Sequence, residues 1–128
     1  MRNGRAIYDS MRLFSFRRNL FIVSLQYQVP LSEVDQHLPA HRDFLRQHYE
    51  KNIFVASGAK IPRTGGVIIA TIENKQHLEA ILKQDPFYQN KIATYEITEF
   101  KPLLYSDDFK CIAEKDRRIL EAPVMDHR

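Results

Sequence analysis

The sequence contains a single cysteine, four glycines, no tryptophan and no long hydrophobic run. With Cys111 alone, neither an internal disulfide nor a cysteine-based metal cluster can form. The few glycines form no glycine-rich loop ahead of a helix, so the usual phosphate-binding motif is missing. No apolar run approaches the roughly 18 residues of a membrane span, so we expect no membrane partner. The lone cysteine fits a reducing compartment, and we expect a cytoplasmic protein.

The net positive charge lies mostly at the start of the chain. Residues 1–19 hold five arginines against one aspartate, a formal charge of +4, which leaves −1 for the rest of a chain whose total is +3. Without this leader the chain lacks the basic surface that nucleic-acid binding requires, so we expect no nucleic-acid partner. An Arg-rich, acid-poor start is also typical of targeting peptides. Because it has no apolar period, we interpret it as a disordered tail or an over-extended start.

Apolar periodicity in the remaining residues predicts six elements of one globular domain. Alternation predicts strands at 20–28, 53–57, 66–72 and 91–101, and helical spacing predicts helices at 31–49 and 75–84. In this order, two strand–helix–strand units interleave as a ferredoxin-like βαββαβ fold. We expect an α+β domain over residues 20–102, with a four-stranded antiparallel sheet and both helices on one face. Residues 103–128 form a polar tail in which Ile112, Ile119 and Leu120 indicate a short helix.

The third predicted strand is apolar on both of its faces. Its two sets of alternating side chains are Ile68 and Ala70 on one side and Val67 and Ile69 on the other. Two helices cover only one face of a sheet, so the other face keeps an apolar surface of the kind that binds a partner. The simplest partner is a second copy packed sheet against sheet, and we expect a homodimer.

The helix predicted at residues 31–49 carries a histidine on its apolar stripe. The stripe consists of Leu31, Val34, Leu38 and Leu45. His41 lies three residues after one stripe leucine and four before the next, so its imidazole is directed at whatever the helix packs on.

Other residues mark the ends of the predicted helices and one irregularity. Ser32 and Asp35 resemble a capping box, and Asn52 is a plausible stop for the same helix. Asn74 is a typical cap for the second helix. Pro39 removes a backbone donor inside the first helix, so we expect the helix to kink or restart there.

Two interpretations of His41 remain open. A buried histidine is often simply hydrogen-bonded to a backbone carbonyl. Alternatively, it is a general base that a carboxylate orients, and Asp85 is the candidate. Asp85 precedes Pro86 and is fully explained as the cap of a short helical turn. In contact with His41, however, the same carboxylate would fix the imidazole tautomer and produce a general base near neutral pH.

Two further candidates have weaker support. Arg63 lies at the tip of the connection between the second and third strands, where it meets either an anionic ligand or only solvent. His37 and His41 have the i, i+4 spacing of a helical metal site but lack the accompanying carboxylate of the usual motif. We therefore expect no metal, and no cofactor motif is present.

Four segments resemble the YCII-related (YciI-like) family of small bacterial proteins. They are FIVSLQYQVP, PAHRDFLRQHYEKNIFVASGAK, GVIIATI and QDPFYQNKIATYEITEFKP, which together extend over residues 20–102. The resemblance implies a dimeric α+β barrel of ferredoxin-like subunits, with a His–Asp pair, here His41 and Asp85, as the active site. Ser57 and Gly58 belong to the motif and are, with Arg63, candidate ligand-binding residues. This chain departs from the family at Gly58-Ala59, where members commonly have Gly-Pro.

We therefore expect an enzyme of the lyase or isomerase type that transfers a proton on a small, aromatic or enolisable molecule. The resemblance includes a dehydrochlorinase of a chlorinated hydroxyquinol, which implies that the His–Asp pair supports proton-transfer elimination. The alternative is a non-catalytic ligand-binding or assembly module in which His41 is structural. A cavity beside His41 with room for a ring favours the enzyme, and a filled core favours the module.

Overall fold

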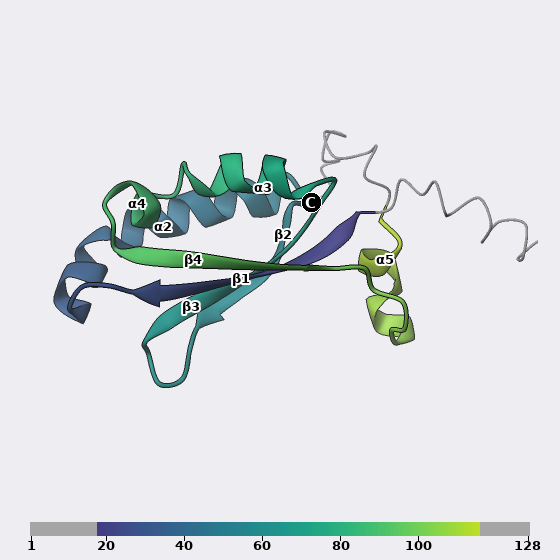
Figure 1. Cartoon of the computed structure of the whole chain (residues 1–128), viewed down its shortest axis with the longest axis horizontal. Coiled ribbons are helices and arrows are strands. Elements are labelled where there is room, and N and C mark those ends of the chain that lie inside the picture. The colour runs from purple at the N-terminus through teal and green to yellow at the C-terminus, as the bar shows by residue number, and fades with distance from the viewer. Residues whose placement is uncertain (1–17, 116–128) are drawn as a thin grey trace, which may run out of the picture.

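The computed structural model describes residues 18–115, which form the predicted α+β fold. The main elements follow the order strand, helix, strand, strand, helix, strand (Figure 1). They are β1 (Asn19–Tyr27), α2 (Leu31–Glu50), β2 (Phe54–Ala59), β3 (Gly65–Ile72), α3 (Lys75–Leu82) and β4 (Ala93–Phe100). Shorter elements are α4 (Pro86–Gln89), the 3-10 turn η2 (Asp107–Phe109) and α5 (Lys110–Ala113).

The four strands form one antiparallel sheet in the order β2-β3-β1-β4. This order confirms the predicted ferredoxin-like arrangement, because the first and third strands lie in the centre of the sheet. Figure 1 shows α2, α3 and α4 on one side of the sheet and α5 on the other, near the start of β1. One sheet face is therefore covered by helices, and most of the other is not.

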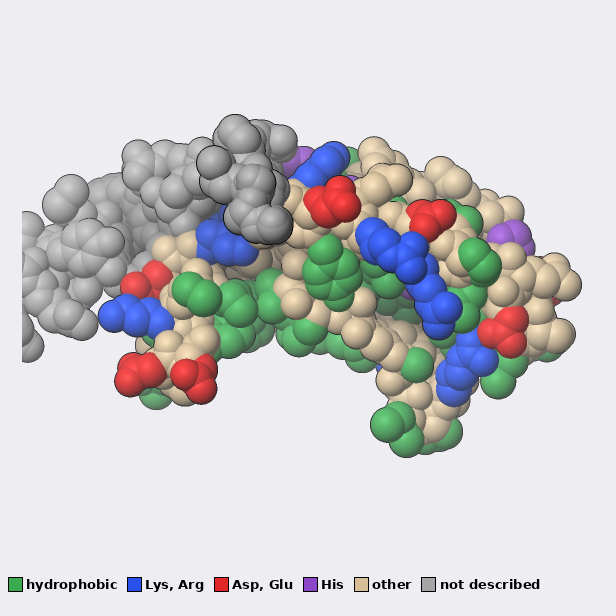
Figure 2. Space-filling model, turned by 180° about the vertical axis from the view of Figure 1, so that it is seen from behind, with side chains coloured by type: hydrophobic (Ala, Val, Ile, Leu, Met, Phe, Trp, Pro, Cys, Tyr) green, Lys and Arg blue, Asp and Glu red, His purple; other side chains and the backbone are tan. Residues whose placement is uncertain are grey.

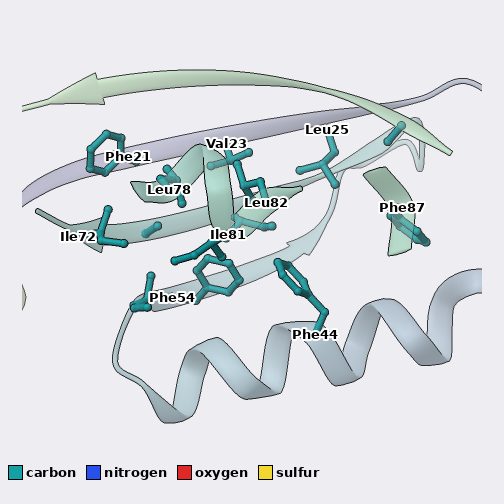
Figure 3. Close-up of a cluster of buried hydrophobic side chains, with 14 of the residues drawn as sticks. Phe21, Val23, Leu25, Phe44, Phe54, Ile72, Leu78, Ile81, Leu82 and Phe87 are labelled. Atoms are coloured by element: carbon teal, nitrogen blue, oxygen red, sulfur yellow. The ribbon is translucent and has the colours of Figure 1, made fainter. Parts of the chain in front are cut away.

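The core lies between the sheet and the helices, as the alternation in β1 predicts. Phe21, Val23 and Leu25 are buried on the helix side, whereas the residues between them are less buried. Figure 3 shows these three side chains directed at Leu78 and Leu82 of α3. Each fully buried side chain of this size contributes about 1.5–3 kcal/mol, so this layer holds the helices against the sheet.

The uncovered sheet face is partly apolar and hollow. It carries Ile22 of β1 paired with Ile69 of β3, both half-buried, and Phe100 of β4 is 43% exposed. Figure 2 shows hydrophobic side chains along a concave underside between two projecting lobes.

The helix α2 differs from the prediction at its start and at Pro39. Its N-cap is Pro30, and no side chain caps it, so the predicted capping box of Ser32 and Asp35 is not formed. Instead the carbonyl of Pro30 accepts hydrogen bonds from the first turn. The helix runs without interruption from Leu31 to Glu50, so the predicted restart at Pro39 is wrong. The proline ring is exposed, and the loss of one backbone donor is tolerated there.

The buried face of α2 is also rotated from the predicted stripe. The buried residues are Val34, His41, Phe44 and His48. Leu31, a predicted stripe residue, is 42% exposed. Leu38 and Leu45 are only partly buried, because they lie on the flank of the helix beside this row. The helix ends at Glu50, and Asn52 forms the predicted stop, because its φ of 60° is left-handed and the amide of Ile53 donates to the carbonyl of His48 at 3.0 Å.

The two ends of the described chain meet beside the start of the central strand β1. Arg18 is buried, and its guanidinium donates to the carbonyls of Asn52 at 2.8 Å and Thr71 at 3.0 Å. Its backbone amide donates to the carbonyl of Lys115 at 3.0 Å. The last two residues of the predicted leader are thus packed in the domain. The rest of the leader and the tail residues 119 and 120 lie outside the described residues. Within residues 18–115, no helix is long and apolar enough to cross a membrane.

Candidate functional site

A cleft of ≈ 500 Å³ lies between α2 and the β2–β3 hairpin. Its apolar wall is formed by Leu25, Leu38, Leu45, Ile68 and Phe87. Polar side chains of α2 and the hairpin also line it. Ligand sites typically measure about 300–1,000 Å³, so the cleft has room for a small organic molecule.

His41 lies in the wall of this cleft and is held by Asp85. The two side chains are 2.8 Å apart, between the Nδ1 atom of His41 and the Oδ1 atom of Asp85. His41 is 8% exposed and Asp85 is completely buried. The imidazole stacks on the ring of Phe87, with 3.9 Å between ring centroids and 3° between planes. Ring stacking and the hydrogen bond together fix the imidazole in one orientation.

The hydrogen bond to Asp85 also determines which ring nitrogen of His41 can act as a base. Because the carboxylate accepts from Nδ1–H, the lone pair of the neutral ring is on Nε2. Among residues 18–115, no hydrogen-bond partner occupies Nε2, and His41 lines the cleft. Nε2 is therefore the ring nitrogen at which the neutral imidazole can accept a proton.

Three donors bind the carboxylate of Asp85. Its Oδ1 accepts from the amide of Phe87 at 2.9 Å, which caps α4, as well as from His41. Its Oδ2 accepts from the hydroxyl of Tyr95 at 2.6 Å. The backbone of Asp85 is extended, as expected of a residue before proline. The two interpretations of Asp85, as a helix cap and as the partner of His41, are therefore both satisfied by one side chain.

Tyr95 is a site residue that sequence reasoning did not identify. It lies opposite Leu25 in the β1–β4 pairing, on the helix side of the sheet. Burial first, and then the negative charge of Asp85, raise the pKa of Tyr95 well above its ordinary value. The hydroxyl therefore stays protonated and donates to the carboxylate. The alternation in β4 could have placed Tyr95 on this face, but the contact joins it to a loop ten residues away.

The predicted ligand-binding residues gather around the same cleft. Ser57, Gly58 and Arg63 line it together with His41, whereas Asp85 lies behind the imidazole. A bulge between Phe54 and Ala56 shifts the register of β2, so that Ser57 pairs with Ile68 on the helix side of the sheet.

Two polar contacts connect α2 to the hairpin across the cleft. The hydroxyl groups of Tyr49 and Ser57 are 2.7 Å apart. Arg63 is paired with Asp35 of α2 at 2.6 Å, with side chains 36% and 55% exposed. Arg63 is thus paired within the protein while it lines the cleft, and its role in binding an anionic ligand stays a prediction.

The other histidines of α2 are placed differently. His48 is buried, and its Nδ1–H donates to the carbonyl of Phe44 at 3.0 Å. Burial is the main cause that lowers the pKa of His48. His37 does not line the cleft. In the described part of the chain, no group of three or more His, Cys, Asp or Glu side chains could hold a metal.

Comparisons with known proteins agree with this fold. The chain matches the YCII-related domain over residues 20–101. No curated protein matches it. Among solved structures, it resembles the 5-chloro-2-hydroxyhydroquinone dehydrochlorinase of Burkholderia phenoliruptrix AC1100, solved in complex with 2,5-dihydroxybenzoquinone. The TM-score is 0.56 and the sequence identity is 17%, and the match covers 64% of this chain and 93% of the dehydrochlorinase chain. At this identity the likeness shows the fold alone. Because the domain match spans well over half of the sequence, this chain belongs to the YCII-related family.

Proposed function

We propose that the protein is an enzyme that transfers a proton on a small molecule bound in the cleft. The observation that carries the proposal is the position of His41, whose Nδ1–H is held by a buried carboxylate while its Nε2 is available to the cleft. This is the arrangement of a general base, which typically accelerates a reaction about 10²–10⁴-fold. The alternative of a filled core around His41 has less support, since a cleft of ≈ 500 Å³ adjoins the ring.

In the proposed reaction, Nε2 of His41 takes a proton from a carbon of the substrate. The electrons of the broken C–H bond form a new double bond as a leaving group departs with its own electron pair, which is an elimination. When the proton is returned to another carbon instead, the result is an isomerisation. In both cases the positive imidazolium is stabilised by the carboxylate of Asp85, which Tyr95 and the amide of Phe87 hold in place.

The substrate class follows in part from the cleft walls. Leu38, Leu45 and Phe87 present apolar surface to a molecule beside His41, which favours an aromatic or enolisable compound. The dehydrochlorinase with the same fold acts, by its name, on a chlorinated hydroxyquinol. Because likeness of fold does not transfer activity, this supports the reaction class and not a particular substrate.

The working unit that we propose is a homodimer in the cytoplasm. The support is the uncovered sheet face, where Ile22, Ile69 and Phe100 form an apolar surface. Sheet-against-sheet packing of two copies would cover it. Sedimentation at micromolar concentration tests the assembly, and a stable monomer would contradict it.

The test of the proposed function is exchange of substrate hydrogen with solvent deuterium. The protein is incubated in D₂O with hydroxyquinols and 1,3-diketones, and mass spectrometry measures deuterium incorporation. Both compound classes also exchange hydrogen slowly without an enzyme, so rates are compared with a protein-free sample. We expect catalysed exchange with the wild type and none above background with His41→Gln. His37→Gln is the matched control on the same helix and should exchange like the wild type. A ligand that binds but shows no catalysed exchange would identify a binding module instead.

A further inference from the structure

Three guanidinium groups line the cleft that contains His41. They belong to Arg42 and Arg46 of α2 and Arg63 of the hairpin, and among residues 18–115 the only carboxylate in the lining is that of Asp35. In Figure 2, Lys and Arg side chains gather between the upper part of the molecule and the lower-right lobe. The cleft therefore combines apolar walls with an excess of positively charged side chains. Elsewhere the formal charge of the domain is nearly balanced.

Two of the three arginines already have carboxylate partners in the protein. Arg63 is bound to Asp35 at 2.6 Å. Arg46 is bound to Asp43 at 2.8 Å, one turn of the helix away. Asp85, the other carboxylate near the site, is completely buried behind His41 and already accepts three hydrogen bonds. The negative charges near the cleft are thus engaged.

Arg42 remains as the cation of the cleft for which residues 18–115 supply no acceptor. It follows His41 in the sequence and lies four residues after Leu38 and three before Leu45, so it is beside both apolar wall residues on the helix surface. Its guanidinium offers a planar pair of donors, which matches the two oxygens of a carboxylate.

We propose that the substrate of the cleft is a small organic carboxylate whose carboxylate binds Arg42 while its carbon skeleton packs between Leu38 and Leu45. This inference rests on the proposed function, because it assigns a charge to the substrate of the same site. An anion bound here places a reactive carbon next to His41, and Arg42 also stabilises the negative charge that develops when the proton leaves. Arg42 is then the residue that selects charged over neutral molecules.

The test compares pairs of ligands of the same size and shape, of which one carries a carboxylate and the other a neutral amide. The pairs are benzoate and benzamide, 2,5-dihydroxybenzoate and its amide, and levulinate and levulinamide, and calorimetry measures their affinities. We expect the carboxylate of at least one pair to bind about tenfold more tightly than its amide, the usual difference for a charged hydrogen bond. If no carboxylate binds more tightly than its amide, the proposal is wrong.

Variants of Arg42 assign the preference to one residue. Arg42→Gln should weaken carboxylate binding about tenfold and leave amide binding unchanged, and Arg42→Lys should retain part of the preference. Lys75→Gln on α3 removes the same charge outside the cleft lining and should change neither affinity. Equal weakening of both ligands by Arg42→Gln would overturn the proposal, since it would show a steric and not a charge effect.

The two proposals fail in different ways. If His41-dependent deuterium exchange occurs with neutral compounds and no carboxylate is preferred, the charge assignment is wrong and the proposed function stands. If levulinate, whose ketone makes neighbouring C–H bonds exchangeable, binds in an Arg42-dependent way without His41-dependent exchange, the charge assignment stands and the proposed function is wrong.

Discussion

His41 and His48 lie two turns apart on the same buried face of α2, yet their surroundings are opposite. His41 donates to a carboxylate and borders a cleft, whereas His48 donates to the backbone carbonyl of Phe44 and is packed against the rings of Phe44 and Phe54, 4.7 and 5.2 Å away. His48 is the satisfied core histidine that the sequence offered as one explanation of His41. The comparison shows that two histidines on one helix face differ in the group that accepts from Nδ1 and in whether a cleft adjoins the ring.

The largest expected effect separates the two histidines by activity. His41→Gln should lower the deuterium-exchange rate by about 10²–10⁴-fold, because it removes the proposed base. His48→Gln should leave the rate nearly unchanged and lower the stability by about 1–3 kcal/mol, because a buried polar group loses its partner. Exchange kinetics and urea unfolding measure the two effects. Equal loss of activity in both variants would remove the distinction between them.

The second prediction concerns the partner of His41. Asp85→Asn keeps an acceptor for the amide of Phe87 but removes the negative charge that stabilises an imidazolium. We expect the exchange rate to fall by about 10²-fold and the stability to fall by about 1–3 kcal/mol, the usual consequence of disturbing a buried network. An exchange rate at the wild-type level would mean that the carboxylate serves only as a helix cap.

The third prediction uses the lowered pKa of His48. Because the folded protein binds this proton less readily than the unfolded chain does, stability is fully present above the unfolded pKa of about 6.5 and is lost as the pH falls below it. The slope from one such group is at most about 1.4 kcal/mol per pH unit. His48→Phe should reduce this slope of stability against pH. Thermal unfolding between pH 7.5 and pH 5 measures the slope. An unchanged slope in His48→Phe would assign the acid sensitivity to other groups.

The smallest expected effect is that of Tyr95. Tyr95→Phe removes one of three donors to Asp85 and leaves the hydrogen bond to His41 in place. We expect a loss of about 1 kcal/mol in stability and an exchange rate reduced less than tenfold, while the packing around His48 is unaffected. A decrease as large as that in Asp85→Asn would mean that the tyrosine, and not the carboxylate alone, sets the position of the imidazole.

Local patterns predicted the fold better than they predicted the site. The alternation in β1 and the apolar spacing of α3 specified which faces are buried, because packing against a sheet repeats at fixed intervals. The capping box failed because the carbonyl of Pro30 serves the first turn of α2 in place of a side chain. Leu31 was wrongly assigned to the buried face of α2, because the apolar residues of the first turn do not determine which face of a long helix is buried.

Contacts between distant segments explain what the sequence left undetermined. Asp85 could be named as a candidate partner of His41, and the family resemblance supported it, but no local pattern shows a contact between residues 44 positions apart. The roles of Tyr95 and Arg42 depend on which loop and which carboxylates lie nearby, and no local period encodes that. The bulge in β2, which brings Ser57 to the cleft side of the sheet, also has no signal in the residues around it.

The hydrogen bond between the amide of Arg18 and the carbonyl of Lys115 joins the two ends of the described backbone, so that the chain between them forms a closed ring. A ring closed between such distant residues forms only after the sheet has assembled, because the loop entropy must first be overcome by other contacts. The same bond is therefore expected to open early in native-state fluctuations, and the amide of Arg18 to exchange hydrogen faster than that of Val23 in the core. This hydrogen bond lies near the start of β1 and α5, away from the β2–β3 hairpin (Figure 1), so it can open without disturbing the cleft.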